Sequence, residues 1–371
     1  MSVRSSQAAA RQAFDIKREG ESRMPPGPIS GPSAWYGPEL AKRSDWIVRL
    51  STEDHAEIDR AVAAFQASAR PLAEISPNAF PLPRLAPRLK EMLHEMLDGR
   101  GFVLLRGLDV ERYSPEQNAI AYMGLGSYFG VPRSQNAKGH LLGHVADLGL
   151  KIEDPNVRYY QTNRRLDYHT DSVDIVGLLC LRTAMSGGES FIVSSTTCYN
   201  EILKRRPDLL PRLFDAFPTD RRGEVPEGML SWFEIPVYHW LDGRLSAILS
   251  MEYIESAQAR FPEARRLTPA HREALDLLRS LVNDPALHLS MEFRPGDMQF
   301  LHNHQILHAR NDFVNWPEPE RRRHLLRLWL CPPDGRPLPE SYAARYGSVE
   351  PGNRGGIVVR GTRFSVPLQP E

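Results

Sequence analysis

A histidine and an aspartate stand two positions apart in this chain, at His169 and Asp171. Side chains two residues apart on a β-strand project from the same face, so this spacing would place an imidazole beside a carboxylate. These groups are two of the three ligands in the two-histidine, one-carboxylate triad that holds non-haem iron and leaves other coordination positions open. Because so short a motif arises by chance in many chains, this interpretation requires a third ligand from elsewhere in the sequence.

We predict that the third ligand is His308, which follows a strand–turn–strand pattern. Residues 295–297 (Pro-Gly-Asp) indicate a turn, residues 298–302 an apolar strand, and the next residues a second turn. His308 then begins the returning strand, where an imidazole can close a metal site at the mouth of a barrel. His302 and His304 are the alternatives in this segment, and we interpret both as structural histidines.

A zinc hydrolase is not predicted. His140 and His144 have the four-residue spacing of the helical HExxH motif, but Leu141 stands where that motif has its general-base glutamate.

Two arginines lie in a segment that otherwise has the pattern of a buried strand. Arg323, Leu325 and Arg327 alternate with His324 and Leu326, which leaves apolar residues on both faces. A buried arginine requires an anionic partner. A dicarboxylate cosubstrate would supply one, because the planar guanidinium group binds a carboxylate through two parallel hydrogen bonds.

Together these segments resemble the taurine / 2,4-dichlorophenoxyacetate dioxygenase-like family over about residues 100 to 332. The resemblance rests on five motifs in this order: Gly101-Phe-Val-Leu-Leu-Arg-Gly107, His169-Thr-Asp171, Gly187-Gly-Glu-Ser190, His308-Ala-Arg310 and Arg322-Arg-His-Leu-Leu-Arg327. It implies a double-stranded β-helix fold and an oxygenase that uses Fe(II), 2-oxoglutarate and O2.

The resemblance also implies roles for individual residues. His169, Asp171 and His308 would bind the iron, and Arg323 would pair with the distal carboxylate of 2-oxoglutarate with help from the Ser190 hydroxyl. Arg327 would lie near the 1-carboxylate of the cosubstrate or near the substrate.

The retained carboxylate bears on the type of reaction. Halogenases of this family lack it, so Asp171 favours hydroxylation, with release of succinate and CO2, or another oxidation that begins with removal of a hydrogen atom. Desaturation or cyclisation at the same iron stays open as an alternative. A non-catalytic β-barrel binding protein is the alternative from another class, but such a scaffold has no need for the triad and the two arginines.

Three departures from the family pattern leave the identity of the substrate open. The segment between Asp171 and Gly187 is shorter than in taurine dioxygenase, residues 315–320 form an apparent insertion, and Ser190 replaces the usual threonine.

We expect the substrate to be a small, carboxylate-bearing molecule. A site inside a barrel is concave and suits a small ligand. Arg327 is the predicted anchor for its anionic group, and Gln161 and Asn163, just before the His-x-Asp motif, are expected to assist. The alternatives are that Arg327 is already satisfied by the cosubstrate or by an internal carboxylate, and that Gln161 and Asn163 are structural.

The helices and strands expected along the chain indicate the fold that positions these residues. They predict a β-rich α+β fold, with a jelly-roll core and flanking and inserted helices. Helices are expected near 53–68, 84–98, 115–130, 197–213 and 268–283. Strands are expected at 101–107, 157–162, 175–182, 190–194, 287–293, 298–302, 307–311 and 324–330, with a hairpin over 236–253 that turns at Asp242-Gly243.

These elements predict one oxygenase domain over residues 35–335, with its core at about 100–332 and a helical insertion at about 197–285. Residues 1–34, rich in Ser, Arg, Gly and Pro, are expected to form a flexible tail, and residues 336–371 a C-terminal extension.

The composition indicates which partners the protein is expected to bind and in which compartment it is expected to work. Lys plus Arg and Asp plus Glu both number 46 in 371 residues, so the basic excess of a nucleic-acid or membrane-surface binder is missing. The three cysteines form no CxxC pair and predict reduced thiols. With no apolar run of signal-peptide or membrane-spanning length, we expect a cytoplasmic protein; formation of a homo-oligomer stays open.

Overall fold

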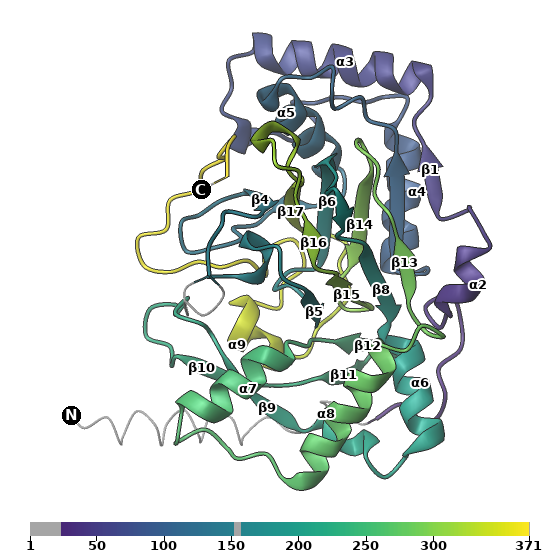
Figure 1. The fold of residues 1–371 in the computed structure, drawn as a ribbon, viewed down its shortest axis with the longest axis vertical. Helices are drawn as coiled ribbons and strands as arrows, with labels where there is room; N and C mark the ends of the chain where they lie inside the picture. Colours follow the sequence, from purple (N-terminus) through teal and green to yellow (C-terminus); the bar gives the residue numbers. More distant parts are fainter. Residues whose placement is uncertain (1–23, 152–156, 371) are drawn as a thin grey trace.

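Two facing β-sheets form the core of the computed structural model, which describes residues 24–151 and 157–370 (Figure 1). The larger sheet has the order β1-β2-β14-β6-β17-β3, with β4 also paired to β17, and the smaller sheet has the order β13-β8-β15-β5. The bounds of the larger sheet are Ile47–Arg49 (β1), Phe102–Arg106 (β2), Val131–Pro132 (β3), Leu142–Ala146 (β4), Ile175–Arg182 (β6), Met298–His302 (β14) and His324–Cys331 (β17). Those of the smaller sheet are Leu166–His169 (β5), Ser190–Ser194 (β8), Leu289–Met291 (β13) and Ile306–Arg310 (β15).

The alternation in β17 shows how the sequence fixes the two faces of the larger sheet. Leu326 and Leu328 belong to the apolar cluster on its outer face, whereas Trp329 belongs to the cluster between the two sheets. All eight residues of β17 are buried, so the prediction of a strand buried on both faces is confirmed. Arg327, two positions from Trp329, therefore shares the interior face.

Helices cover the outer faces of both sheets. On the larger sheet lie α3 (Thr52–Ala67), α4 (Ala86–Leu97) and α5 (Pro115–Gly126), whose apolar residues form one cluster with those of the sheet. Ser51 and Ser114 start α3 and α5 with capping boxes, which satisfy the free backbone N–H groups of the first turn. The smaller sheet is covered from the other side, at the bottom of Figure 1.

The predicted insertion supplies that second cover. It contains α6 (Ser195–Arg205), α7 (Met251–Arg260) and α8 (Pro269–Val282), together with two antiparallel strand pairs. The pairs join β9 (Ala216–Asp220) to β10 (Trp232–Pro236), and β11 (Tyr238–Leu241) to β12 (Arg244–Ala247). The β11–β12 hairpin turns at Asp242 and Gly243, which both have positive φ angles of 49° and 74°. The predicted two-residue turn is therefore confirmed.

One predicted strand is wrong. Residues 159–161 form a short 3-10 helix, η2 (Tyr159–Gln161), in place of part of a strand over 157–162. Local hydrogen bonds explain the difference, because the Gln161 side chain accepts from the backbone N–H of Arg158 at 3.0 Å and closes the turn on itself.

The chain ends contact the core at the points where the structure describes them. Of the predicted tail, residues 1–23 lie outside the described residues, whereas the backbone of Ile29 exchanges two hydrogen bonds of 2.8 Å with the Asn200 side chain on α6. The C-terminal extension contains α9 (Ala343–Tyr346) and returns to the core, where Arg354 is fully buried. The remaining short elements are α2 (Gly37–Ala41), β7 (Ser186–Gly187), β16 (Phe313–Val314), η1 (Leu72–Glu74), η3 (Leu210–Phe214), η4 (Pro319–Arg321) and η5 (Glu340–Tyr342).

The three cysteines, Cys180, Cys198 and Cys331, are buried and unpaired. Within the described residues, none of the helices has the length and apolar character needed to cross a bilayer.

Candidate metal centre and substrate cavity

His169, Asp171 and His308 converge at the open end of the smaller sheet. His169 ends β5 and lies directly opposite His308 on β15, and Asp171 follows in the loop. The Asp171 carboxylate lies 3.7 Å from His169 Nε2 and 3.9 Å from His308 Nε2. One ligand atom from each residue lies within 4.8 Å of the other two. Two imidazoles and one carboxylate at this separation match the donor set of a facial triad.

Backbone contacts orient the first histidine. His169 Nδ1 lies 2.8 Å from the carbonyl oxygen of Asp167, so the ring can donate there and present Nε2 to the cluster. The next residue, Thr170, is tied to Leu249 by a backbone hydrogen bond of 2.8 Å and by a bond from the Leu249 N–H to its hydroxyl of 3.0 Å. The inserted segment thus fixes the end of β5.

Asp171 is held ionised by the groups around it. Burial raises the pKa of this carboxyl group, but Arg327, His169 and His308 outweigh that effect and lower it, with help from a 3.0 Å hydrogen bond donated by Trp329. Burial lowers the pKa of His308 to about 3, which keeps its imidazole neutral. A carboxylate and neutral imidazoles are the protonation states that bind a metal.

The loop that carries Asp171 is fixed by Asn303. The Asn303 side chain accepts from the Asp171 N–H at 3.2 Å and donates to the Val173 carbonyl oxygen at 2.8 Å. The hydroxyl of Tyr346, from the C-terminal extension, also lies 3.4 Å from the carbonyl oxygen of Asp171 and 3.4 Å from that of Val173.

The other two histidines of the segment lie in a separate buried cluster. His302 and His304 gather with Asp174, and His304 Nε2 lies 3.0 Å from the Asp174 carboxylate. Arg354 donates to the same carboxylate from two nitrogens and forms a fully buried ion pair with it. A guanidinium group already occupies this carboxylate, so the geometry supports a structural role for His302 and His304.

Arg323 is buried, and no carboxylate of the described residues pairs with it. Within the described residues its Nη1 has no hydrogen bond, and its Nη2 is 3.5 Å from the carbonyl oxygen of Gly188. The guanidinium group also stacks on Phe313, with 5.0 Å between its carbon and the ring centre. Burial lowers the pKa of Arg323 to about 10. Such a group fits an anion that enters from outside the protein, because an unpaired buried charge is costly.

The Gly-Gly turn before β8 makes room for this arginine. Gly188 has a φ of +78°, and a Cβ atom there would lie 2.9 Å from Arg323 Nε. Ser190, two residues on, is buried and lies opposite Arg310 across the strands. It shares a strand face with Ile192, whose side chain belongs to the cluster between the sheets.

Arg327 lies beside the triad. Its Nη1 is 3.7 Å from the Asp171 carboxylate, and its Nε donates to Gln135 at 2.7 Å. The guanidinium carbon stands 4.6 Å from the ring centre of Tyr160 and 5.1 Å from that of Trp329. An internal carboxylate therefore contacts Arg327, which is one of the alternatives left open by the sequence.

Two predicted substrate residues do not line the cavity. The Gln161 amide is engaged in closing η2, and Asn163 is exposed, with its carbonyl oxygen bonded to the Phe313 N–H at 3.1 Å. Their neighbours Tyr159 and Tyr160 line the cavity instead. Residues 159–161 form a helical turn instead of continuing a strand, which accounts for the position of these two side chains outside the cavity wall.

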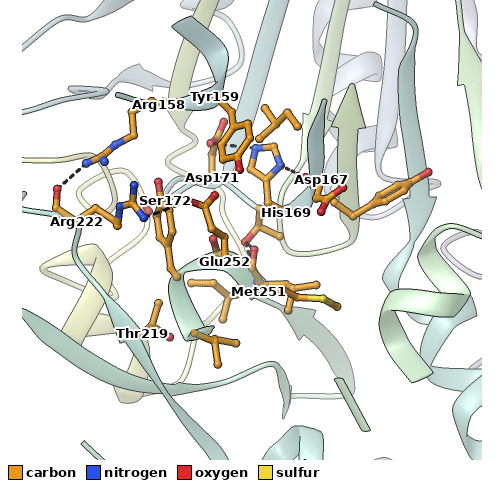
Figure 2. A pocket seen from close by; sticks show the side chains of 18 of the residues that line it. Arg158, Tyr159, Asp167, His169, Asp171, Ser172, Thr219, Arg222, Met251 and Glu252 are labelled. Atoms are coloured by element: carbon orange, nitrogen blue, oxygen red, sulfur yellow. Dashed lines mark hydrogen bonds and ion pairs between the residues drawn. The ribbon is translucent and has the colours of Figure 1, made fainter. Parts of the chain in front are cut away.

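The cavity beside the triad has a volume of about 420 Å³. Figure 2 shows His169 and Asp171 in its wall, with Arg158, Arg222 and Glu252 among the other lining residues. The sequence did not identify these charged residues, nor Tyr253 and Arg345, because the segment before η2, the loop after β9, α7 and α9 bring them together from distant parts of the chain. A cavity of this size suits a small ligand.

The family of this chain is shown by comparison. A family model described as "Taurine catabolism dioxygenase TauD, TfdA family" matches residues 68–329. This chain belongs to that family. It is accordingly an Fe(II)- and 2-oxoglutarate-dependent dioxygenase with a jelly-roll core, which confirms the predicted fold, enzyme class and cofactors.

Individual relatives cover most of the chain. It is 33% identical over 325 residues to a taurine hydroxylase-like protein, SAT17, from Stachybotrys chartarum, covering 83% of each chain. It is 29% identical over 329 residues to FR-33289 synthase from Streptomyces rubellomurinus, covering 86% of this chain and 95% of the relative. Among solved structures, an asparagine oxygenase superimposes with a TM-score of 0.61 at 18% identity, covering 77% of this chain and 93% of the other. At this low identity, the structural similarity supports the fold and nothing further.

Proposed function

We propose that His169, Asp171 and His308 bind the iron of this dioxygenase and that the enzyme hydroxylates a small anionic molecule in the adjoining cavity. The observation that carries the proposal is the convergence of three suitable ligand atoms within 4.8 Å, from β5, the loop after it and β15. Iron supplies the activation of O2, and the chain supplies ligation, orientation and a shaped cavity.

Arg323 and Ser190 are proposed to bind the distal carboxylate of 2-oxoglutarate. The support is the buried Nη1 of Arg323, which lacks a partner among the described residues. Arg327 is proposed to serve an anionic group next to the iron, either the 1-carboxylate of the cosubstrate or the substrate. The support for either role is its 3.7 Å separation from the carboxylate of Asp171.

Hydroxylation is the proposed reaction because the carboxylate ligand is retained, with desaturation or cyclisation as the alternatives. Taurine and uridine 5′-phosphate, which occur in the names of two relatives, are both small molecules with an acidic group. Two structural neighbours, an asparagine oxygenase and the non-haem iron oxygenase OrfP, have been solved with hydroxylated asparagine and hydroxylated arginine, which are amino acids. A small acid is thus the proposed substrate class; the sequence alone led us to expect a carboxylate as its acidic group.

We also propose that this small molecule is the partner of the enzyme, rather than a nucleic acid, and that the enzyme works in the cytoplasm. The support is the balance of 46 basic and 46 acidic residues and the three unpaired, buried cysteines.

Iron binding by single-residue variants tests the proposal. The protein should bind one Fe(II) per chain under anaerobic conditions, and His169→Ala, Asp171→Ala and His308→Ala should each lose it. His304→Ala is the matched control, because His304 lies in the same segment but in the other cluster. If His304→Ala lost iron while His308→Ala kept it, the assignment of the third ligand would be wrong.

A further inference from the structure

One wall of the cavity holds donors that the iron and cosubstrate sites do not use. Arg158, Tyr253 and Arg345 line the same cavity as His169 and Asp171. They come from the segment before η2, from α7 and from α9. Arg345 lies beyond residue 329, where the match to the family model ends.

Arg345 enters the cavity as a positioned cation without an acidic partner. Its Nε donates to the Ser172 hydroxyl at 2.5 Å, next to Asp171, and its guanidinium carbon lies 5.7 Å from the ring centre of Phe233. Among the described residues, no carboxylate comes within ion-pair distance of it. The side chain is thus oriented by Ser172, and its two terminal nitrogens keep their hydrogen-bonding capacity.

Arg158 is only partly satisfied. Its Nη2 donates to the Arg222 carbonyl oxygen at 2.8 Å and lies 3.5 Å from the Glu224 carboxylate. Its Nη1 is buried and has no hydrogen-bond partner among the described residues. Figure 2 shows the Arg158 and Arg222 side chains on one side of the cavity, with His169 on the other. A buried donor without a hydrogen-bond partner costs free energy unless a ligand accepts a hydrogen bond from it.

The Tyr253 hydroxyl adds a third donor between these cations. It lies in the electrostatic field of both the Arg158 and the Arg345 guanidinium groups, although burial, the larger effect, raises its pKa. Arg222 stacks against the same ring at 5.6 Å. No hydrogen bond engages this hydroxyl within the described residues, so it can donate to a ligand.

Other arginines of the cavity already have acidic partners. Arg222 donates to Glu252 at 3.1 Å, and Arg165 to Asp167 at 3.1 Å. Arg279 pairs with Glu255 and, at 3.2 Å, with Asp276. Arg158 shares its charge with Glu224, so among the described residues the positive charge without an acidic partner lies at Arg345, and Arg158 contributes its unpartnered Nη1.

We propose that Arg158, Tyr253 and Arg345 form an anion subsite that holds the acidic group of the substrate, and that this group is a tetrahedral oxyanion such as a phosphonate, phosphate ester or sulfonate. Three donors from three separate elements match three peripheral oxygens, whereas a planar carboxylate offers two. The inference rests on the proposed function, which it deepens by assigning substrate anchoring to this wall. The Arg345–Ser172 bond then sets the distance between the bound anion and the triad.

Calorimetric titration of the anaerobic Fe(II)–2-oxoglutarate protein tests the subsite, because the cosubstrate then occupies the Arg323 position. Methylphosphonate, methanesulfonate and acetate are the probes. We expect the two tetrahedral anions to bind more tightly than acetate. Arg345→Gln and Arg158→Gln should each weaken methylphosphonate binding by roughly 10- to 100-fold, as for loss of a charged hydrogen bond, and Tyr253→Phe by roughly 2- to 10-fold.

Arg279→Gln is the matched control, because Arg279 lines the same cavity but is already paired, and it should bind methylphosphonate as the wild type does. Tyr253→Phe removes a single oxygen, so it tests the subsite even if an arginine variant misfolds. Wild-type affinity in Arg345→Gln and Tyr253→Phe, or tighter binding of acetate than of methylphosphonate, would overturn the proposal. The absorption band of the Fe(II)–2-oxoglutarate complex should form in every variant; its absence from the wild type would instead contradict the proposed function.

Discussion

At the scale of single residues, the role that we assign to a charged side chain depends on whether another residue already neutralises its charge. Arg323 and Arg327 lie four positions apart near one strand, yet in the part of the chain that the structure describes only Arg327 contacts a carboxylate. The alternating pattern predicted that both are buried, and the structure bears this out. It could not predict which arginine has a partner, because Asp171 reaches Arg327 from a segment more than a hundred residues away.

Gly188→Ala should weaken the binding of 2-oxoglutarate. The added Cβ would lie 2.9 Å from Arg323 Nε, so the guanidinium group must shift away from the position proposed for the cosubstrate. We expect the KM for 2-oxoglutarate to rise by roughly 10-fold, as for the loss of about 1.4 kcal/mol of binding free energy. Succinate formation at several cosubstrate concentrations measures it.

Gly223→Ala controls for the backbone. Gly223 has a similar φ of +82°, but a Cβ there would meet nothing within 4 Å. Gly223→Ala should lower the free energy of unfolding about as much as Gly188→Ala does, and it should leave the KM for 2-oxoglutarate unchanged. Equal KM changes in the two variants would show that contact with Arg323 is not responsible.

At the scale of elements, local patterns predicted the strands well and the loops poorly. The predicted bounds of β6, β8 and β14 match the structure, because apolar alternation and flanking glycines are local signals. The loop after β5 is different, since Asn303, from the turn between β14 and β15, and Tyr346 hold it from distant parts of the sequence. No local pattern reports such contacts. The mistaken strand at η2 has a local cause instead, the hydrogen bond by which the Gln161 side chain closes the turn.

Asn303→Ala should loosen iron binding without removing a ligand. It deletes the acceptor for the Asp171 N–H and the donor to Val173, so the carboxylate is less well positioned. Residues that orient metal ligands typically contribute about 10- to 100-fold in affinity, and we expect a loss in that range. Competition with a chelator under anaerobic conditions measures it.

Asn118→Ala is the control for general destabilisation. Asn118 is also a buried asparagine that bonds backbone carbonyl oxygens, those of Val110 and Tyr113, but it lies on α5. It should lower stability and leave iron affinity as in the wild type. If both variants lost iron affinity equally, Asn303 would not be a positioning residue.

At the scale of the whole molecule, the C-terminal extension is part of the structure around the site. Arg354 forms a fully buried ion pair with Asp174, and the Gly356 N–H donates to the Ser172 carbonyl oxygen at 2.7 Å. The sequence after residue 332, rich in Pro and Gly, gave no periodic pattern from which this could be predicted. Its position depends on single long-range contacts rather than on an amphipathic element.

Buried histidines should make the metal-free protein sensitive to acid. Burial lowers the pKa of His239 and His324 to about 3 and that of His304 to about 4. In the unfolded chain these groups titrate near their ordinary value of about 6.5, so below that pH the unfolded state binds more protons. The free energy of unfolding should therefore fall between pH 6.5 and 4, by up to about 1.4 kcal/mol per pH unit for each histidine.

Urea unfolding at several pH values in this range measures the effect. His304→Gln should reduce the slope of stability against pH by about one proton. Asp174, whose pKa is lowered to about 2 because its hydrogen bonds and charges from His304 and Arg354 outweigh burial, loses its contribution only below about pH 4. An unchanged stability between pH 6.5 and 4.5 would contradict the assignment of neutral buried histidines.

The most direct test of the account is a titration of 2-oxoglutarate into the anaerobic Fe(II) protein, followed by the absorption band of the complex. Arg323→Met keeps most of the side-chain volume and removes the charge. We expect a saturable band in the wild type and an affinity weakened by roughly 30-fold or more in Arg323→Met, since breaking a buried charge pair costs about 2–5 kcal/mol. A wild-type affinity in Arg323→Met would show that the cosubstrate binds elsewhere.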